Sequence, residues 1–162
     1  MVVGIGERGE DVVLATSYLG IGDIRDRLAP GEIFRKATLE PMASVLTRYC
    51  DGYFQALDEV AVSQQGGPFQ QDVWRAMRKI PAGSVETYGG VARRAGRPRA
   101  YRAVGTACAI NLTAPFVPCH RVVAAEGLGG YGYGLNVKIA LLAHEQVVYD
   151  LDQTFGSSRA LK

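Results

Sequence analysis

Residues 87–109, TYGGVARRAGRPRAYRAVGTACA, carry the strongest indication of the fold. Thr87 suits the N-cap of a helix, because its hydroxyl can accept a hydrogen bond from a backbone amide of the first turn. Gly96 suits the C′ position after that helix, because glycine adopts a positive φ without strain. Pro98 fits the first turn of a further helix, which we expect to run from about Pro98 to Ala109. Two helices joined by a tight glycine turn are typical of a helix-turn-helix.

A helix is also expected before this pair. Phe69, Val73, Met77 and Ile80 recur at helical spacing, and the following proline disfavours helix at Ile80. The stretch before Phe69 is polar, rich in glycine and poor in apolar residues, as linkers are. The predicted division is an N-terminal lobe over 1–63, a linker over 64–68, a C-terminal domain over 69–150 and a tail over 151–162.

The N-terminal part predicts strands followed by a helix. Val2–Ile5 and Val12–Tyr18 are short apolar runs separated by a polar, glycine-containing segment, which favours a β-hairpin. Apolar residues recur at helical spacing over residues 41–56, and Cys50 falls on or beside that apolar face, so we expect a buried structural thiol there. The predicted class is α/β (α+β), with a small strand-and-helix lobe and a mostly helical C-terminal lobe.

Composition excludes several classes of protein. The chain has 162 residues, 48% of them hydrophobic, which is enough for a core and unlike a disordered or fibrous composition. No apolar run reaches the roughly 18 residues of a membrane span. The first residues lack the basic and apolar regions of a secretion signal. We therefore expect a cytoplasmic protein.

The cysteines and histidines narrow the chemistry further. Cys50, Cys108 and Cys119 are an odd number without a CxxC pair, so free thiols in a reducing compartment are expected. His120 and His144 are too few, and too poorly spaced from the cysteines, to complete a structural zinc site. We expect no bound metal.

Basic residues are concentrated in the second half of the chain. Residues 1–63 contain six basic and ten acidic side chains, whereas residues 64–162 contain twelve and six. This bias allows either a solvated basic face or a polyanionic partner. The predicted helix over 98–109 has small side chains, which close helix packing or docking on nucleic acid could explain, and its arginines favour nucleic acid. The arginines on and before it are Arg93, Arg94, Arg97, Arg99 and Arg102.

Residues 115–123, PFVPCHRVV, contain the most specific chemical pattern. A thiolate is a good nucleophile, but a free cysteine has a pKa near 8.5 and needs a neighbouring base or cation. His120 is adjacent to Cys119 and could act directly or through a water molecule. Glu145 is a candidate for orienting the imidazole. The pattern predicts a reactive Cys119.

The segment from Phe69 to Glu145 resembles the O6-alkylguanine-DNA alkyltransferase family. The resemblance is strong over about half of the chain and weak over the N-terminal lobe, where the family's opening Ser-Pro-x-Gly turn is not found. The matching motifs, in order, are FQQDVW (69–74), IPAG (80–83), TYG (87–89), RAVG (102–105), Asn111, PCHRV (118–122), GYG (130–132) and 138–145.

The resemblance implies a DNA repair protein with an RNase H-like N-terminal lobe. Such a protein flips O6-alkylguanine out of double-stranded DNA and transfers the alkyl group irreversibly to its own Cys119, so that each molecule acts once. No cofactor is required, because guanine itself is the leaving group. We expect a monomer that can bind DNA cooperatively, with no membrane partner.

The resemblance also implies roles for individual residues. His120, through a water molecule, and Glu145 match a proton relay, and Asn111 matches an asparagine that braces the active-site turn. Tyr88 matches the tyrosine that helps extrude the nucleotide, and Arg102 matches the arginine that fills the vacated stack. The other expected DNA-binding residues are Ala103, Thr106, Arg94 and Arg99, and the expected substrate pocket comprises Tyr88, Val122, Tyr131, Gly132 and Tyr133.

Several alternatives remain open from the sequence. A non-catalytic binder of alkylated DNA needs no cysteine, yet Cys119 is present. A Cys–His hydrolase leaves the basic helix-turn-helix unexplained, and a plain helix-turn-helix regulator leaves residues 118–121 unexplained. Tyr133 adds bulk that is expected to restrict large O6 substituents, and Cys108 is a candidate second site of alkylation or oxidation.

Overall fold

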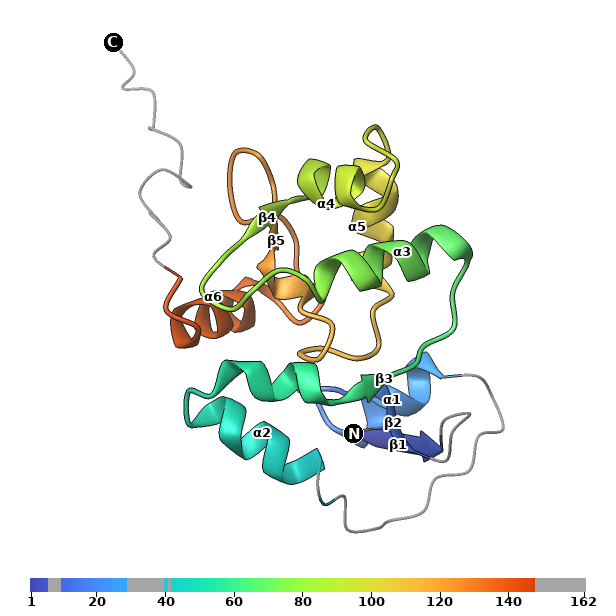
Figure 1. Ribbon diagram of the computed structural model, residues 1–162, viewed down its shortest axis with the longest axis vertical. Coiled ribbons are helices and arrows are strands. Elements are labelled where there is room, and N and C mark those ends of the chain that lie inside the picture. The colour runs from blue at the N-terminus through green and yellow to red at the C-terminus, as the bar shows by residue number, and fades with distance from the viewer. Residues whose placement is uncertain (6–9, 29–39, 41, 148–162) are drawn as a thin grey trace.

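The N-terminal lobe combines a small sheet with two helices (Figure 1). The computed structural model describes residues 1–5, 10–28, 40 and 42–147. Strand β1 (Val2–Ile5) pairs antiparallel with β2 (Asp11–Ala15), as the predicted hairpin requires, and β3 (Ala61–Val62) pairs parallel with β2. Helix α1 (Ile21–Arg27) follows β2. The turn residues of the hairpin, 6–9, lie outside the described residues.

Helix α2 (Met42–Cys50) is shorter than the helix predicted over 41–56. Gly52 adopts a φ of 95°, and the amides of Gly52 and Tyr53 donate to the carbonyls of Tyr49 and Arg48 in a Schellman motif. The chain continues as a 3₁₀ helix, η1 (Phe54–Glu59). The prediction of a buried Cys50 is wrong: its side chain is exposed, because the buried face of α2 is formed by Met42, Val45 and Tyr49.

The C-terminal lobe contains the expected helix-turn-helix. Helix α3 (Pro68–Met77) leads through β4 (Glu86–Thr87) to α4 (Tyr88–Arg94) and α5 (Tyr101–Ala109). Thr87 caps α4 by accepting a hydrogen bond from the Gly90 amide, and Gly96 has the positive φ of 78° expected at C′. Helix α5 begins three residues later than predicted, because a turn over Arg97–Ala100 precedes it, closed by a 2.9 Å hydrogen bond from the Ala100 amide to the Arg97 carbonyl.

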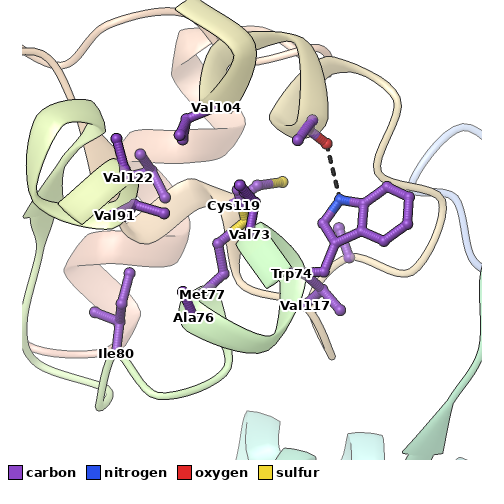
Figure 2. Packing of buried hydrophobic residues seen from close by; sticks show 13 residues of the cluster. Val73, Trp74, Ala76, Met77, Ile80, Val91, Val104, Val117, Cys119 and Val122 are labelled. Atoms are coloured by element: carbon purple, nitrogen blue, oxygen red, sulfur yellow. Dashed lines mark hydrogen bonds between the residues drawn. The ribbon is translucent and has the colours of Figure 1, made fainter. Parts of the chain in front are cut away.

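The segment with the predicted nucleophile is anchored at both ends. A short 3₁₀ helix, η2 (Cys119–Arg121), runs directly into β5 (Val122–Val123), which pairs parallel with β4. Helix α6 (Leu135–His144) packs against η2. Cys119 lies in the core cluster that includes Val73 and Val122 (Figure 2). In the same cluster Trp74 donates from Nε1 to the Ala107 carbonyl, at 3.0 Å, which joins α3 to α5.

The two lobes share apolar and polar contacts. Phe116 and Leu141, from the C-terminal lobe, pack in the core of the N-terminal lobe with Val13 and Tyr49. The Thr16 hydroxyl donates to the carbonyl of Ala114. The helices and small sheets described above confirm the mixed α/β class. The site described next lies where the two lobes meet.

Candidate active site

Cys119 is held in a tight turn and is only 7% exposed. Its amide donates to the carbonyl of Val117 at 2.9 Å across Pro118. Its Sγ lies 3.1 Å from Nδ2 of Asn111. Burial raises the pKa of the thiol, and the hydrogen bond from Asn111 lowers it. The balance is a raised pKa, so the resting group is a thiol that needs a proton acceptor to react.

Asn111 connects the thiol to Gln64, in the segment between the two lobes. Its Nδ2 also donates to the Val117 carbonyl at 2.8 Å, so one amide group holds both ends of the turn at Cys119. Its Oδ1 accepts from the amide of Thr113 at 3.1 Å and from Nε2 of Gln64 at 3.0 Å. The side chain is 2% exposed, and these bonds fix its orientation.

Glu145 is the C-cap residue of α6 and accepts from three side chains. Nε2 of His120 lies 3.0 Å from Oε1, and Arg121 donates to both carboxylate oxygens at 2.8 Å. The hydroxyl of Tyr49 donates to Oε1 at 2.7 Å. Burial alone would raise the pKa of Glu145, but the hydrogen bonds from His120 and Arg121 outweigh it and lower the pKa to about 2. The group is a buried carboxylate.

His120 is fully buried next to this carboxylate. Burial lowers its pKa, although the hydrogen bond with Glu145 acts in the opposite direction. A neutral ring that donates from Nε2 to Glu145 keeps Nδ1 as an acceptor. Nδ1 has no hydrogen-bond partner among the described residues. The ring can therefore accept a proton at Nδ1 while Glu145 stabilises the cation that results.

A cavity of about 150 Å³ adjoins Cys119. The C-terminal lobe contributes Asn111, Tyr131, Gly132 and Tyr133 to its wall, together with Cys108 from α5. The N-terminal lobe closes it with Leu19 and with Asp23 and Arg27 of α1. A larger cavity of about 550 Å³ borders Arg27 and Ile110 but contains none of the predicted site residues. The chemistry therefore belongs to the smaller cavity.

Tyr133 lines the cavity and is braced by the N-terminal lobe. Its hydroxyl accepts from Nη1 of Arg27 at 2.7 Å and donates to the Thr16 carbonyl at 3.2 Å. The ring of Tyr18 packs edge-on against it, with centroids 4.9 Å apart. Tyr133 is thus a fixed wall of the cavity that the N-terminal lobe holds in position.

Two of the predicted pocket residues do not border this cavity. The side chain of Val122 is buried in the core, and its carbonyl accepts from Nζ of Lys138 at 2.6 Å. Lys138 is itself fully buried and donates also to the carbonyl of Leu128, so it ties β5 to the loop before Tyr131. Tyr88 is half-buried at the start of α4, where it lies against Gly129.

The predicted DNA-binding residues other than Tyr88 are exposed, and they belong to α4, to α5 and to the connection between them. Val104 and Ala107 of α5 face the core, whereas Arg102, Ala103 and Thr106 are exposed. Arg94 is exposed and forms an ion pair of 2.9 Å with Glu86. Arg99 is exposed in the turn before α5, next to Arg97. The exposed face of α5 therefore presents small side chains bordered by arginines.

Sequence reasoning missed several residues of the site. Arg121 of the C-terminal lobe donates to both oxygens of Glu145, and the N-terminal lobe contributes Tyr49 and three cavity residues, Leu19, Asp23 and Arg27. Tyr49 was placed only on the apolar face of a helix, whereas its hydroxyl reaches Glu145. Asp23 and Arg27 of α1 line the cavity, although their sequence has no pattern that links them to it. The one available signal for Tyr49 was its hydroxyl, a polar group on an apolar helix face that needs a hydrogen-bond partner when it is buried.

Within the described ranges, no helix has the length and apolar character needed to cross a bilayer. The same ranges contain no cluster of histidine, cysteine and acidic side chains placed to hold a metal ion.

The comparisons with known proteins agree on one family. The family described as 6-O-methylguanine DNA methyltransferase, DNA binding domain, matches residues 68–147. The chain is 43% identical over 115 residues to a methylated-DNA–protein-cysteine methyltransferase of Methanosarcina acetivorans, covering 70% of each chain. The structure of Mycobacterium tuberculosis OGT in complex with DNA is similar at 41% identity, a TM-score of 0.59 and coverage of 66% of this chain and 65% of that one.

A second solved structure supports the likeness over both lobes. It is the O6-methylguanine-DNA methyltransferase of Pyrococcus kodakaraensis strain KOD1, with 31% identity, a TM-score of 0.61 and coverage of 75% of this chain and 72% of that one. The chain matches about two thirds of the length of the curated relatives.

Proposed function

The chain belongs to the methylated-DNA–protein-cysteine methyltransferase family, and from this premise we propose that it repairs O6-alkylguanine in duplex DNA by transferring the alkyl group to its own Cys119. The observation that carries the proposal is the placement of Cys119. Cys119 borders a cavity, its Sγ is held by Asn111, and the residue that follows it, His120, lies 3.0 Å from the buried carboxylate of Glu145. No other described cysteine combines these features.

The reaction is a single displacement at the alkyl carbon. Cys119 loses its proton to His120, through a bridging water, and Glu145 stabilises the imidazolium that forms. The Sγ–C bond forms as the C–O6 bond breaks, and the electron pair of that bond leaves with the guanine. The guanine takes up a proton from solvent, His120 releases its extra proton to solvent, and the protein keeps a thioether. Because a thioether does not hydrolyse readily, each molecule acts once.

The target base must leave the duplex to reach Cys119, because the thiol lies within the protein. Extruding a base costs a few kcal/mol, and the gap that remains must be filled. The exposed side chain of Arg102 on α5 is suited to fill it, and the small side chains around it allow close approach to a groove. We assign to Tyr88, which lies at the start of α4, the role of crowding the target phosphate. Arg94 and Arg99 supply phosphate contacts that do not depend on sequence.

Intact mass spectrometry tests this proposal. The protein is mixed with a duplex that contains O6-methylguanine, and Cys119→Ser is treated in parallel. We expect wild type to gain one methyl group, about 14 Da, on the peptide that holds Cys119, and the variant to gain none. Tight binding to the lesion without added mass would instead indicate a non-catalytic binder of alkylated DNA. If the protein shows no added mass and does not bind the lesion, the proposal is overturned.

A further inference from the structure

Tyr49 connects helix α2 of the N-terminal lobe to the carboxylate of Glu145. The two residues are 96 positions apart in sequence, and the Tyr49 hydroxyl donates to Oε1 at 2.7 Å. Both side chains are buried, at 4% and 1% exposure. A buried hydrogen bond to a charged acceptor is among the stronger ones in a protein. The lobe that carries no nucleophile therefore touches the predicted proton relay directly.

The position of Tyr49 is fixed from both sides. Its carbonyl lies 2.9 Å from Nε2 of His144, which immediately precedes Glu145. Its ring packs edge-on against His144, with centroids 5.1 Å apart, and against Phe54 at 5.9 Å. The end of α6 and the end of α2 are thus joined through ring and backbone alike. These contacts position the Tyr49 hydroxyl next to Glu145 independently of the hydrogen bond between the two.

The two oxygens of Glu145 are unequally used. Oε1 lies within hydrogen-bond distance of Tyr49, His120 and Arg121, whereas Oε2 accepts only from Nε of Arg121 among the described residues. A carboxylate oxygen offers about two lone-pair sites, so three donors at one oxygen compete. The hydroxyl of Tyr49 therefore limits how strongly Oε1 can attract the ring proton of His120.

We propose that Tyr49 is a positioning residue for alkyl transfer, whose hydroxyl orients Glu145 and weakens the hold of Glu145 on the His120 ring. This inference rests on the proposed function, because it assigns Tyr49 a role in the same transfer step. Tyr49 acts through Glu145 and is not among the residues that line the cavity.

Loss of the hydroxyl is expected to make His120 more basic. The charged and titratable groups that act on the ring are Glu145, Arg121 and Lys138. Removing the Tyr49 donor leaves the two cations in place and frees Oε1 for His120, which favours the imidazolium and raises the pKa of the ring. A ring that is already protonated cannot accept the proton of Cys119. The rate should then fall on the acid side of the profile and recover as the pH rises.

Single-turnover kinetics of Tyr49→Phe test the proposal. This variant keeps the ring packing and removes the hydroxyl alone. Methyl transfer from a duplex with O6-methylguanine is followed between pH 6 and pH 9, which gives a rate constant and the fraction of protein methylated. We expect the pH profile to move upward by about one unit, the size of a lost hydrogen bond to a charged group, so that the rate constant is up to about tenfold lower on the acid limb and matches wild type at high pH. The methylated fraction at completion should stay at the wild-type value.

Two matched variants separate this role from a merely structural one. Tyr53→Phe removes a hydroxyl from an exposed tyrosine just beyond α2 and should leave rate and profile unchanged. Phe54→Leu loosens the ring contacts of Tyr49 but keeps its hydroxyl, so it should lower stability without displacing the profile. A lower methylated fraction with an unchanged rate constant in Tyr49→Phe would mean that Tyr49 only supports folding, and would overturn the inference.

A double variant tests whether the Tyr49 hydroxyl acts through the carboxylate of Glu145. The hydroxyl is proposed to act only through the carboxylate, so adding Tyr49→Phe to Glu145→Gln should leave the rate constant of Glu145→Gln unchanged. A further fall in the double variant would contradict the proposal. Absence of methyl transfer by wild type would instead overturn the proposed function, and the two failures are therefore distinguishable.

Discussion

Asn111 influences how readily the Cys119 thiol ionises, because it supplies the hydrogen bond that opposes the effect of burial. Asn111→Ala removes that bond, so the pKa of Cys119 should rise further. A hydrogen bond to a charged group contributes about 1.5–3 kcal/mol, which corresponds to about one pH unit or more. We expect the pH profile of the single-turnover rate to move upward by about one unit.

The Asn111 measurement needs a control for the second thiol in the cavity. Cys108 lines the same wall, and burial raises its pKa as well. Cys108→Ser should retain the wild-type profile, because the reacting thiol is Cys119. An unchanged profile in Asn111→Ala would show that Asn111 does not tune the thiol.

Tyr133 limits the space available to the O6 substituent. Its ring borders the cavity of about 150 Å³, and its hydroxyl is held by Arg27 and Thr16. Tyr133→Gly should raise the rate on O6-benzylguanine relative to O6-methylguanine by about tenfold, within the range that the fit of a side chain in a pocket can supply. Tyr133→Phe keeps the bulk and should keep the ratio. Rates are compared on both substrates, and identical ratios in wild type and Tyr133→Gly would discard the hypothesis.

At the scale of single elements, the small side chains of α5 suit this helix to close approach to a DNA groove. A Cβ built at Gly105 meets no atom within 4 Å, so the backbone there has open space for the first atom of a side chain and Gly105→Leu is expected to fold. Leucine also favours the helix over glycine by about 0.8 kcal/mol. If α5 enters a groove, the larger side chain should weaken duplex binding at least about tenfold, or 1.4 kcal/mol, without lowering the Tm. Fluorescence anisotropy and thermal unfolding measure the two effects.

The control for Gly105→Leu is a similar change on a helix that is not predicted to meet DNA. Ala43 is exposed on α2, and Ala43→Leu should leave duplex affinity unchanged. Equal affinity of Gly105→Leu and wild type would mean that α5 does not approach the duplex closely.

Local signals predicted elements well where the stabilising contacts are themselves local. Gly96 ends α4 through bonds to residues of the last turn, and these follow from sequence spacing alone. The same motif at Gly52 was overlooked, because apolar spacing continues past it to Tyr53. Apolar spacing therefore predicted a helix that is too long, and Gly52 determines where the helix ends.

The relay was predictable only in part, because its partners come from distant segments. His120 and Glu145 were paired from a motif, and the structure brings them to 3.0 Å. Tyr49 and Arg27 reach the site only through the packing of one lobe on the other. No periodicity records such a contact, so the sequence indicated no site residue in the N-terminal lobe.

At the scale of the whole molecule, the buried network around Glu145 should govern acid stability. Its pKa is about 2 in the folded protein, below the ordinary 4.5, so the unfolded chain binds more protons between these values. The carboxylate therefore stabilises the fold above pH 4.5, and this contribution, about 3 kcal/mol, is lost as the pH falls towards 2. The lowered pKa of His120 acts in the same direction below pH 6.5, because the unfolded chain takes up that proton first.

Glu145→Gln tests this link between the site and the stability of the fold. The variant leaves the buried Arg121 without a charged partner, so the free energy of unfolding at pH 7 should fall by about 3–5 kcal/mol. It also removes the titrating carboxylate, so the difference from wild type should shrink as the pH falls from 4.5 to 2.5. Urea unfolding at pH 7, 4.5 and 2.5 gives both quantities.

Glu59→Gln disrupts the exposed pair with Arg48 and should change little at any pH. A constant difference between wild type and Glu145→Gln at all three pH values would contradict the prediction, because it would mean that the carboxylate does not titrate across this range in the folded protein.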